Sequence, residues 1–185
     1  MKKRKILVGA ILAGILLAGC GGTDVGNTEP TDGAQENQED VIQNGDINAI
    51  AERIQKSYDI CGIIREIGDG KVVLDAVEFI TLADTERMAE LGLTEGDFPN
   101  GYYIYNADEN TDEYPLAEGA EYNFIDWSRN FVAEDAEDIK VSTKDGAVFE
   151  EYIRPYLEDG SKIRFFFQLD GDQISSITEE ALTSM

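Results

Sequence analysis

Hydrophobic and polar positions divide the chain into three parts. An apolar run over 6–17 follows four cations, and a stretch over 20–46 that is rich in Gly, Thr, Asn, Asp and Glu comes next. From 47 onward, apolar residues recur at the periods of strands and helices. The pattern predicts a leader over 1–19, a disordered tether over 20–46 and one globular domain over 47–185.

Periodicity in the third part predicts both helices and strands. Helices are expected over 47–54, 82–91 and 145–156, where apolar residues fall on one face. Thr81 and Asp84 have the spacing of a capping box for the second helix. The main loop is expected over 107–119. Strands are expected over 58–67, 71–80, 102–106, 122–127, 162–169 and 173–178.

These elements predict an α+β domain. Asp-Gly turns make hairpins at both ends of the domain, which favours a strongly curved antiparallel sheet, or a small OB-like barrel, of about six strands. One or two helices are expected to pack against it. In the last hairpin, Phe165 and Phe167 alternate with Arg164 and Gln168, so the phenylalanine face should point inward and the other face should stay partly wet.

The leader ends in a short motif, Leu17-Ala18-Gly19-Cys20. It resembles the lipobox of bacterial lipoproteins, which implies that Cys20 receives a diacylglyceryl group and that residues 1–19 are removed. The apolar run is shorter than the roughly twenty residues of a membrane-spanning helix. The resemblance implies a protein held on the outer, extracytoplasmic face of the cell membrane by its lipid. The alternative is an ordinary secretory signal.

Three segments of the domain carry a second resemblance. DAVEFI at 75–80, ELGL at 90–93 and DFPNGYYIYN at 97–106 are similar to a pattern in small uncharacterised lipoproteins of Gram-positive bacteria. The similarity covers about a third of the folded part. It implies no assigned reaction, so no catalytic residue is transferred from it.

Charge and cysteine content narrow the chemistry. The chain has 38 acidic and 15 basic residues and no histidine, a net charge of −23 that disfavours binding to nucleic acid. With Cys20 used by the anchor, Cys61 has no disulfide partner. Cys61 lies in an apolar strand without a histidine to activate it, so we expect it in the core. The absence of histidine also excludes a Ser-His-Asp triad.

Aromatic residues supply the main candidate site. Strand positions 102–105 and 122–127 carry tyrosines and a tryptophan that could stack on a sugar or a peptide, although strand aromatics more often fill a core. The candidate ligand-binding residues are Trp127, Arg129, Tyr103 and Tyr105. They favour a non-enzymatic interaction domain for an envelope protein or a cell-wall glycan.

Two alternatives depend on carboxylates. Asp75 and Glu78 could form the acid/base pair of a glycan hydrolase if they faced each other at the right separation. Asp108, Asn110 and Asp112 match the opening of a calcium loop, but the glycine and the final acidic ligand of that loop are missing. The sequence therefore predicts no cofactor. The metal alternative is a calcium-responsive structural module with a weak calcium site at these residues.

Overall fold

The computed structural model describes residues 44–182, with side chains from 47 onward. The leader, Cys20 and most of the tether lie outside the described residues. In chain order the elements are α1 (Asn44–Ser57), β1 (Ile60–Gly68), β2 (Lys71–Thr81), α2 (Thr85–Leu91), the 3-10 helix η1 (Glu95–Asp97), β3 (Tyr102–Tyr105), β4 (Asp112–Ile125), β5 (Lys140–Thr143), α3 (Gly146–Glu158), β6 (Arg164–Asp170) and β7 (Gln173–Thr178). No helix within 44–182 is long and apolar enough to cross a membrane.

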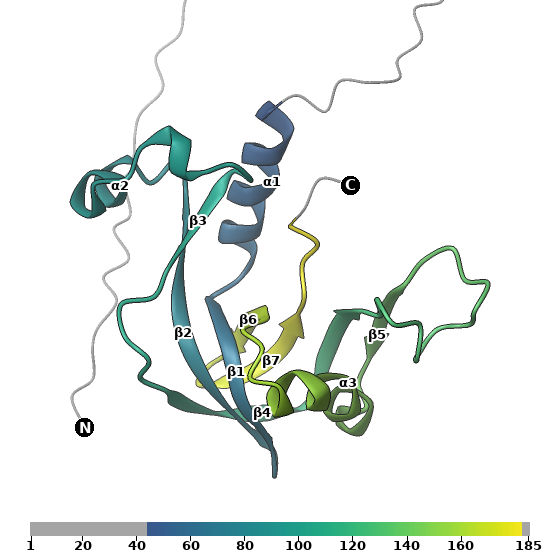
Figure 1. Ribbon diagram of the computed structural model, residues 1–185. Coiled ribbons are helices and arrows are strands. Elements are labelled where there is room, and N and C mark those ends of the chain that lie inside the picture. The colour runs from purple at the N-terminus through teal and green to yellow at the C-terminus, as the bar shows by residue number, and fades with distance from the viewer. Residues whose placement is uncertain (1–43, 183–185) are drawn as a thin grey trace, which may run out of the picture. The chain divides into compact units, whose positions relative to one another are not determined.

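Five strands close into a barrel. Around it the order is β1, β2, β4, β7, β6 and back to β1, with β4 and β7 parallel and the other neighbours antiparallel. The last barrel strand lies between the third and the fourth, as in the Greek-key barrel of OB folds. Strands β3 and β5 extend the sheet beside β2 and β4 (Figure 1). The predicted α+β class with an OB-like barrel is confirmed; the sheet is mixed and has seven strands.

The first hairpin has the predicted turn. Asp69 and Gly70 have φ values of 52° and 74°, the pair of positive angles that a two-residue hairpin turn needs. Strand β1 also approaches β2 closely at Gly62, where a Cβ would lie 3.0 Å from the carbonyl oxygen of Asp75. Glycine therefore lets the barrel wall curve tightly at this point.

The barrel interior is packed mainly with aromatic side chains. Phe124, Phe165 and Phe167 point inward from β4 and β6, and α3 adds Phe149 and Tyr152. The rings of Phe124 and Tyr152 stack with their centroids 4.1 Å apart. Helix α3, which lies between the third and fourth barrel strands in the sequence, thus fills one end of the barrel with the apolar stripe that the sequence predicted.

Two smaller cores lie outside the barrel. Helix α1 packs Ala51 and Ile54 on the outer face of the sheet, over Phe79 and Phe166. Because α1 covers Phe166, the face of β6 that we expected to stay partly wet is dry at that position. Helix α2 covers the opposite side of β2 and β3 with Met88.

The predicted loop over 107–119 is wrong in its second half. Strand β4 begins at Asp112, where it pairs with β2, and Tyr114 and Leu116 turn toward the barrel core. Acidic residues, Pro115 and Gly119 weaken the strand signal in the sequence, but pairing on both edges stabilises the strand. The short strand β5 was not predicted either.

Thr81 and Asp84 bind each other, but they do not form the predicted capping box, and neither side chain caps the helix that follows. The Asp84 carboxylate accepts hydrogen bonds from the backbone N–H of Thr81 at 2.7 Å and from its hydroxyl at 3.0 Å. Helix α2 itself begins only at Thr85, with Asp84 as its N-cap, and ends at Gly92 in the left-handed conformation. The Asp84 carboxylate therefore fixes the turn that leaves β2 and does not cap α2.

We expect Phe167→Ala to destabilise the domain by about 3–5 kcal/mol, because the ring is fully buried in the barrel and its removal leaves a cavity. Ile50→Ala on α1 is the control, since Ile50 is 44% exposed, and it should change stability by less than about 1 kcal/mol. Urea unfolding followed by circular dichroism measures both changes. Equal effects of the two substitutions would contradict the assignment of the barrel interior as the main core.

Candidate functional site

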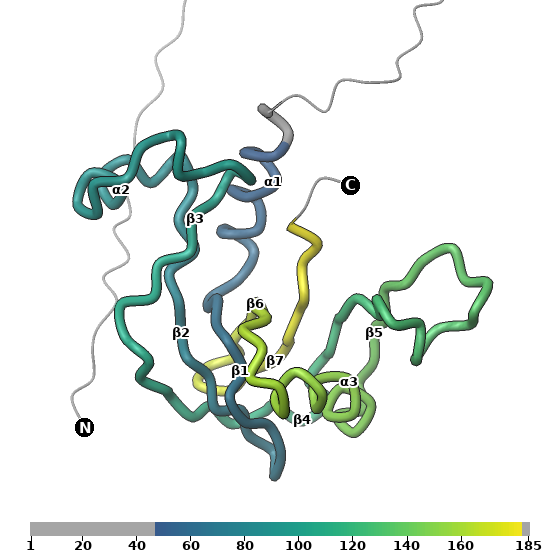
Figure 2. Tube along the Cα trace, in the orientation of Figure 1, coloured from purple at the N-terminus to yellow at the C-terminus, as the bar shows by residue number. Residues whose placement is uncertain are grey.

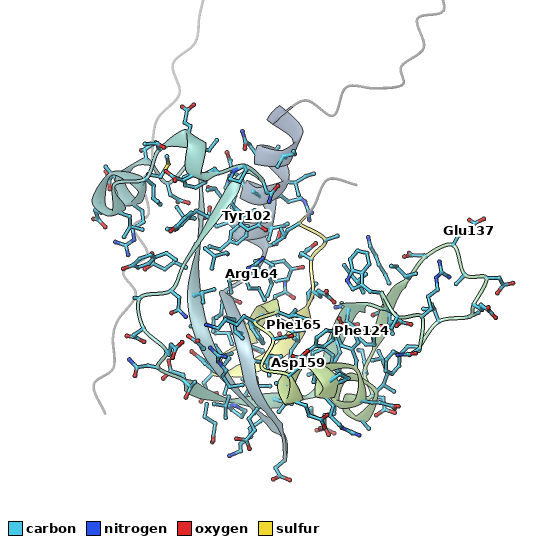
Figure 3. The ribbon with its side chains drawn as sticks, in the orientation of Figure 1. Tyr102, Phe124, Glu137, Asp159, Arg164 and Phe165 are labelled. Atoms are coloured by element: carbon cyan, nitrogen blue, oxygen red, sulfur yellow. The ribbon has the colours of Figure 1, made fainter. Side chains whose placement is uncertain are left out.

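A groove with a volume of about 410 Å³ lies at the end of the barrel where β6 begins and β4 and β7 end. It is lined by Tyr102, Ile125, Trp127 and the segments 161–164 and 179–182, and we call it the Trp127 groove. Figure 3 labels two of its lining residues, Tyr102 and Arg164. Aromatic, apolar and charged groups from four parts of the chain therefore converge here.

Trp127, the only tryptophan in the chain, is the most prominent of these side chains. It follows β4 after Asp126 and is 56% exposed. Its backbone N–H donates to the carbonyl oxygen of Ile125 at 2.9 Å, and its indole Nε1 donates to Glu179 Oε1 at 3.4 Å. A large apolar side chain is thus kept at the surface by a tight turn and a carboxylate.

The Glu179 carboxylate is surrounded by donors from the barrel end. Its Oε2 accepts hydrogen bonds from the backbone N–H of Ile125 at 2.9 Å and from the hydroxyl of Tyr152 at 2.6 Å. Burial raises the pKa of Tyr152, and the hydrogen bond and the negative charge of Glu179 raise it further. The Tyr152 hydroxyl therefore keeps its proton and remains a donor.

Glu180, the second carboxylate of the groove, also has a phenol partner. Its Oε1 accepts a hydrogen bond from the hydroxyl of Tyr58 at 2.7 Å. Burial, followed by the hydrogen bond and the charge of Glu180, raises the pKa of Tyr58 to about 12. Both acidic side chains of the groove are thus hydrogen-bonded within the protein.

Arg164, in contrast, has no such partner. The half-buried side chain takes part in no ion pair among the described residues, and its Nε is buried without a hydrogen-bond acceptor. A buried donor without an acceptor costs about 1–3 kcal/mol of stability. Lys162, the other cation of the groove, is 63% exposed and lies 3.6 Å from a carboxylate oxygen of Glu109. Of the two cations of the groove, Arg164 is therefore the one that no carboxylate of the described residues pairs with.

Tyr103 and Tyr105, two of the predicted binding residues, do not join Trp127. They pack with Ile80 and Met88 under α2, and the Arg87 guanidinium lies 5.4 Å from the centre of the Tyr105 ring. Side chains alternate along β3, so Tyr102 is the tyrosine that lines the groove. The platform predicted from Tyr103 and Tyr105 is corrected to Tyr102.

Arg129, the third predicted partner of Trp127, serves the loop between β4 and β5. It adopts a φ of 54°, and its Nη1 donates to the carbonyl oxygens of Glu134 at 3.0 Å and Ala136 at 2.9 Å. The loop projects from the domain, with Glu137 on its outer part (Figures 2 and 3). Arg164, which alternation along β6 placed on a partly wet face, is the arginine in the groove.

The buried Asp126 carboxylate anchors this loop next to Trp127. It accepts hydrogen bonds from the backbone N–H groups of Asn130 at 3.0 Å, Phe131 at 2.6 Å and Val132 at 3.0 Å. Burial alone would raise the pKa of Asp126, but these hydrogen bonds favour the ionised form and bring the pKa below its ordinary value. The ionised carboxylate therefore fixes the turn that carries Trp127.

Asp75 and Glu78 do not face each other. Asp75 is fully buried, with Arg65 Nη2 at 2.6 Å and Asn106 Nδ2 at 3.3 Å from its carboxylate. Glu78 is bound by Nε and Nη2 of Arg87, both at 2.7 Å. Residues three apart in a strand point to opposite faces, and each carboxylate is held by its own arginine. This arrangement does not form the pair that glycoside hydrolysis needs.

The calcium-loop candidates are all exposed. Asp108 Oδ1 accepts a hydrogen bond from the backbone N–H of Asn110 at 2.9 Å, and Asp112 is the first residue of β4. Over 44–182, no group of three or more His, Cys, Asp or Glu side chains lies close enough together to hold a metal ion.

Cys61 is buried, as predicted, and burial raises the pKa of its thiol to about 12.

In this barrel, the loops that OB folds often use to bind ligands are short turns. OB folds commonly bind along their second and third strands and the loops that join strands one to two and four to five. Here those loops are the tight turns at Gly70 and Gly171, and an ion pair of 2.7 Å between Lys71 and Glu113 joins β2 to β4. The Trp127 groove lies at the other end of the barrel.

No protein-family model, curated protein or solved structure matches the chain. A barrel of this kind supports many unrelated functions, so the fold alone does not indicate an activity. The features of this chain that bear on its function are therefore the groove and the N-terminal motif.

We expect Asp126→Asn to lower stability by about 1–3 kcal/mol at neutral pH, because the buried carboxylate accepts three backbone hydrogen bonds. Its lowered pKa means that this stabilisation is present above the unfolded-state pKa, about 3.9 for aspartate, and is lost as the pH falls through the folded-state value. The difference between the two proteins should therefore shrink below about pH 4. Urea unfolding over this pH range measures it, and a constant difference would contradict the role given to Asp126.

Proposed function

We propose that the chain is a bacterial lipoprotein, anchored through Cys20 to the outer face of the cell membrane, whose OB-like domain is a non-enzymatic binding module. Its ligand is an envelope protein or a cell-wall component. The observation that carries the proposal is the Trp127 groove, in which an exposed tryptophan, a tyrosine and an arginine share one concave surface, and no ion pair of the described residues engages that arginine. Tryptophan, tyrosine and arginine are enriched among the residues that contribute most to binding energy at protein–protein interfaces.

The anchor is supported by the order of the N-terminal parts. A basic and apolar leader, a Leu-Ala-Gly-Cys motif and a polar stretch precede the domain in this sequence. Two acyl chains hold a protein on a bilayer far more firmly than one does. The tether would then allow the groove to reach partners near the membrane surface.

The glycan-hydrolase and calcium alternatives receive less support. Asp75 and Glu78 each bind a different arginine, on opposite faces of β2. The Asp108 carboxylate accepts a hydrogen bond from the backbone N–H of Asn110, and no metal-binding cluster of acidic side chains forms among the described residues. The groove, by comparison, gathers several kinds of binding group in one place.

Lipidation is tested by replacing each cysteine in turn. Cys20→Ser should abolish incorporation of radiolabelled palmitate in the bacterial host and release the protein from the membrane fraction, because the thiol that carries the lipid is gone. Cys61→Ala is the matched control and should keep both label and location, since Cys61 is buried in the domain. Label retained after Cys20→Ser would contradict the anchor.

Binding through the groove is tested with Trp127→Ala. Full-length protein in detergent should sediment with purified cell-wall sacculi or crosslink to a defined neighbour in intact cells, and Trp127→Ala should weaken that association by about tenfold or more. Ile50→Ala, which alters the other large exposed apolar side chain of the described residues, should leave it unchanged. Association that is equal in the two variants would contradict a binding role for the groove.

A further inference from the structure

We propose that the Trp127 groove binds the free C-terminus of a peptide, with the terminal carboxylate on Arg164 and an apolar or aromatic last side chain between Trp127 and Tyr102. This inference rests on the proposed binding function and names the chemistry of its ligand. It follows from the charges, the apolar surface and the size of the groove.

Arg164 is the group of the groove that a ligand anion would contact. The carboxylates of Glu179 and Glu180 accept hydrogen bonds from the protein's own donors, whereas Arg164 pairs with no carboxylate in the described part of the chain. The chain is rich in acidic residues, yet none of those that the structure describes forms an ion pair with this half-buried arginine. The planar guanidinium group binds carboxylates through paired hydrogen bonds, so a ligand carboxylate is a suitable counterion.

The apolar surface of the groove suits a side chain next to that carboxylate. The Tyr102 ring is stacked on Phe79, with centroids 4.9 Å apart and planes 16° apart, and this contact fixes its position. Trp127 is largely exposed, and Ile163 and Leu182 also line the groove. The volume of about 410 Å³ lies within the range of about 300–1,000 Å³ that small ligands occupy.

A peptide fits these features better than a phosphate. Glu179 and Glu180 lie beside Arg164 in a protein of net charge −23, so a doubly charged phosphate group would be repelled by its surroundings. A peptide C-terminus brings a single negative charge. Its amide N–H groups could also donate to the Glu180 carboxylate, which accepts only one hydrogen bond from the described residues.

The single tryptophan makes the groove directly observable. The probe is the tripeptide alanyl-alanyl-phenylalanine, added to the full-length chain in detergent while the fluorescence of Trp127 is recorded. The expected result is a saturable change with the free-acid peptide and binding that is weaker by about tenfold or more for the same peptide with an amidated C-terminus. Equal binding of the acid and the amide would overturn the role of the carboxylate.

The position of the carboxylate is tested on the protein side with a matched pair of variants. Arg164→Gln should remove the preference for the free acid, whereas Arg154→Gln, the same change on α3 outside the groove, should retain it. Thermal unfolding checks that both variants are folded. The ratio of the affinities of the unaltered protein for the free-acid and the amidated peptide tests the carboxylate contact even if a variant does not fold. A preference that survives Arg164→Gln in a folded protein overturns the assignment of Arg164.

Two further results separate this inference from the function on which it rests. An amidated tripeptide with an internal aspartate that binds as well as the free acid would overturn recognition of a C-terminus. If no peptide changes the fluorescence while attachment to the envelope still depends on Trp127, the ligand class is wrong and the binding function stands. If attachment does not depend on Trp127, the binding function itself fails.

Discussion

The barrel depends on one long strand, β4, which pairs at both edges. Its first residues bond to β2 and its middle runs parallel to β7, so this strand joins the first hairpin to the last and closes the sheet. Its final residues pair with β5, and the chain then turns at Asp126. Because Trp127 follows directly, closure of the barrel also decides where the exposed tryptophan lies.

The Glu179 carboxylate connects the core to the groove. It binds the end of β4 through the Ile125 N–H, helix α3 through the buried Tyr152 and the surface through the indole of Trp127. The segment after β7 is fixed in turn by the bond from the Glu179 N–H to the Asn123 carbonyl. One acidic residue therefore couples the packing of α3 to the position of a candidate ligand-binding side chain.

Periodicity was sufficient to predict the hairpins, the three main helices and the α+β class, because those segments have one clearly apolar face. It failed for the first half of β4, where the outward positions are acidic and the strand is stabilised by neighbours distant in the sequence. It also could not choose between Tyr102 and Tyr103, since both faces of β3 are covered and all four of its residues are half-buried. Arg164 was missed as a site residue because only the folded groove shows that its Nε is buried without an acceptor and that no described carboxylate forms an ion pair with it.

The strong negative charge of the chain limits what the groove can bind. An acidic surface repels phosphate-rich polymers before they make contact, because charge is the main interaction at long range. Salt screens this repulsion beyond about 10 Å. Inside the groove the balance is local, because Arg164 and Lys162 lie beside carboxylates that already accept hydrogen bonds. A ligand with one negative charge next to an apolar group gains the arginine contact without bringing a second charge close to Glu179. The same acidity that disfavours nucleic acid therefore favours a small, singly charged ligand.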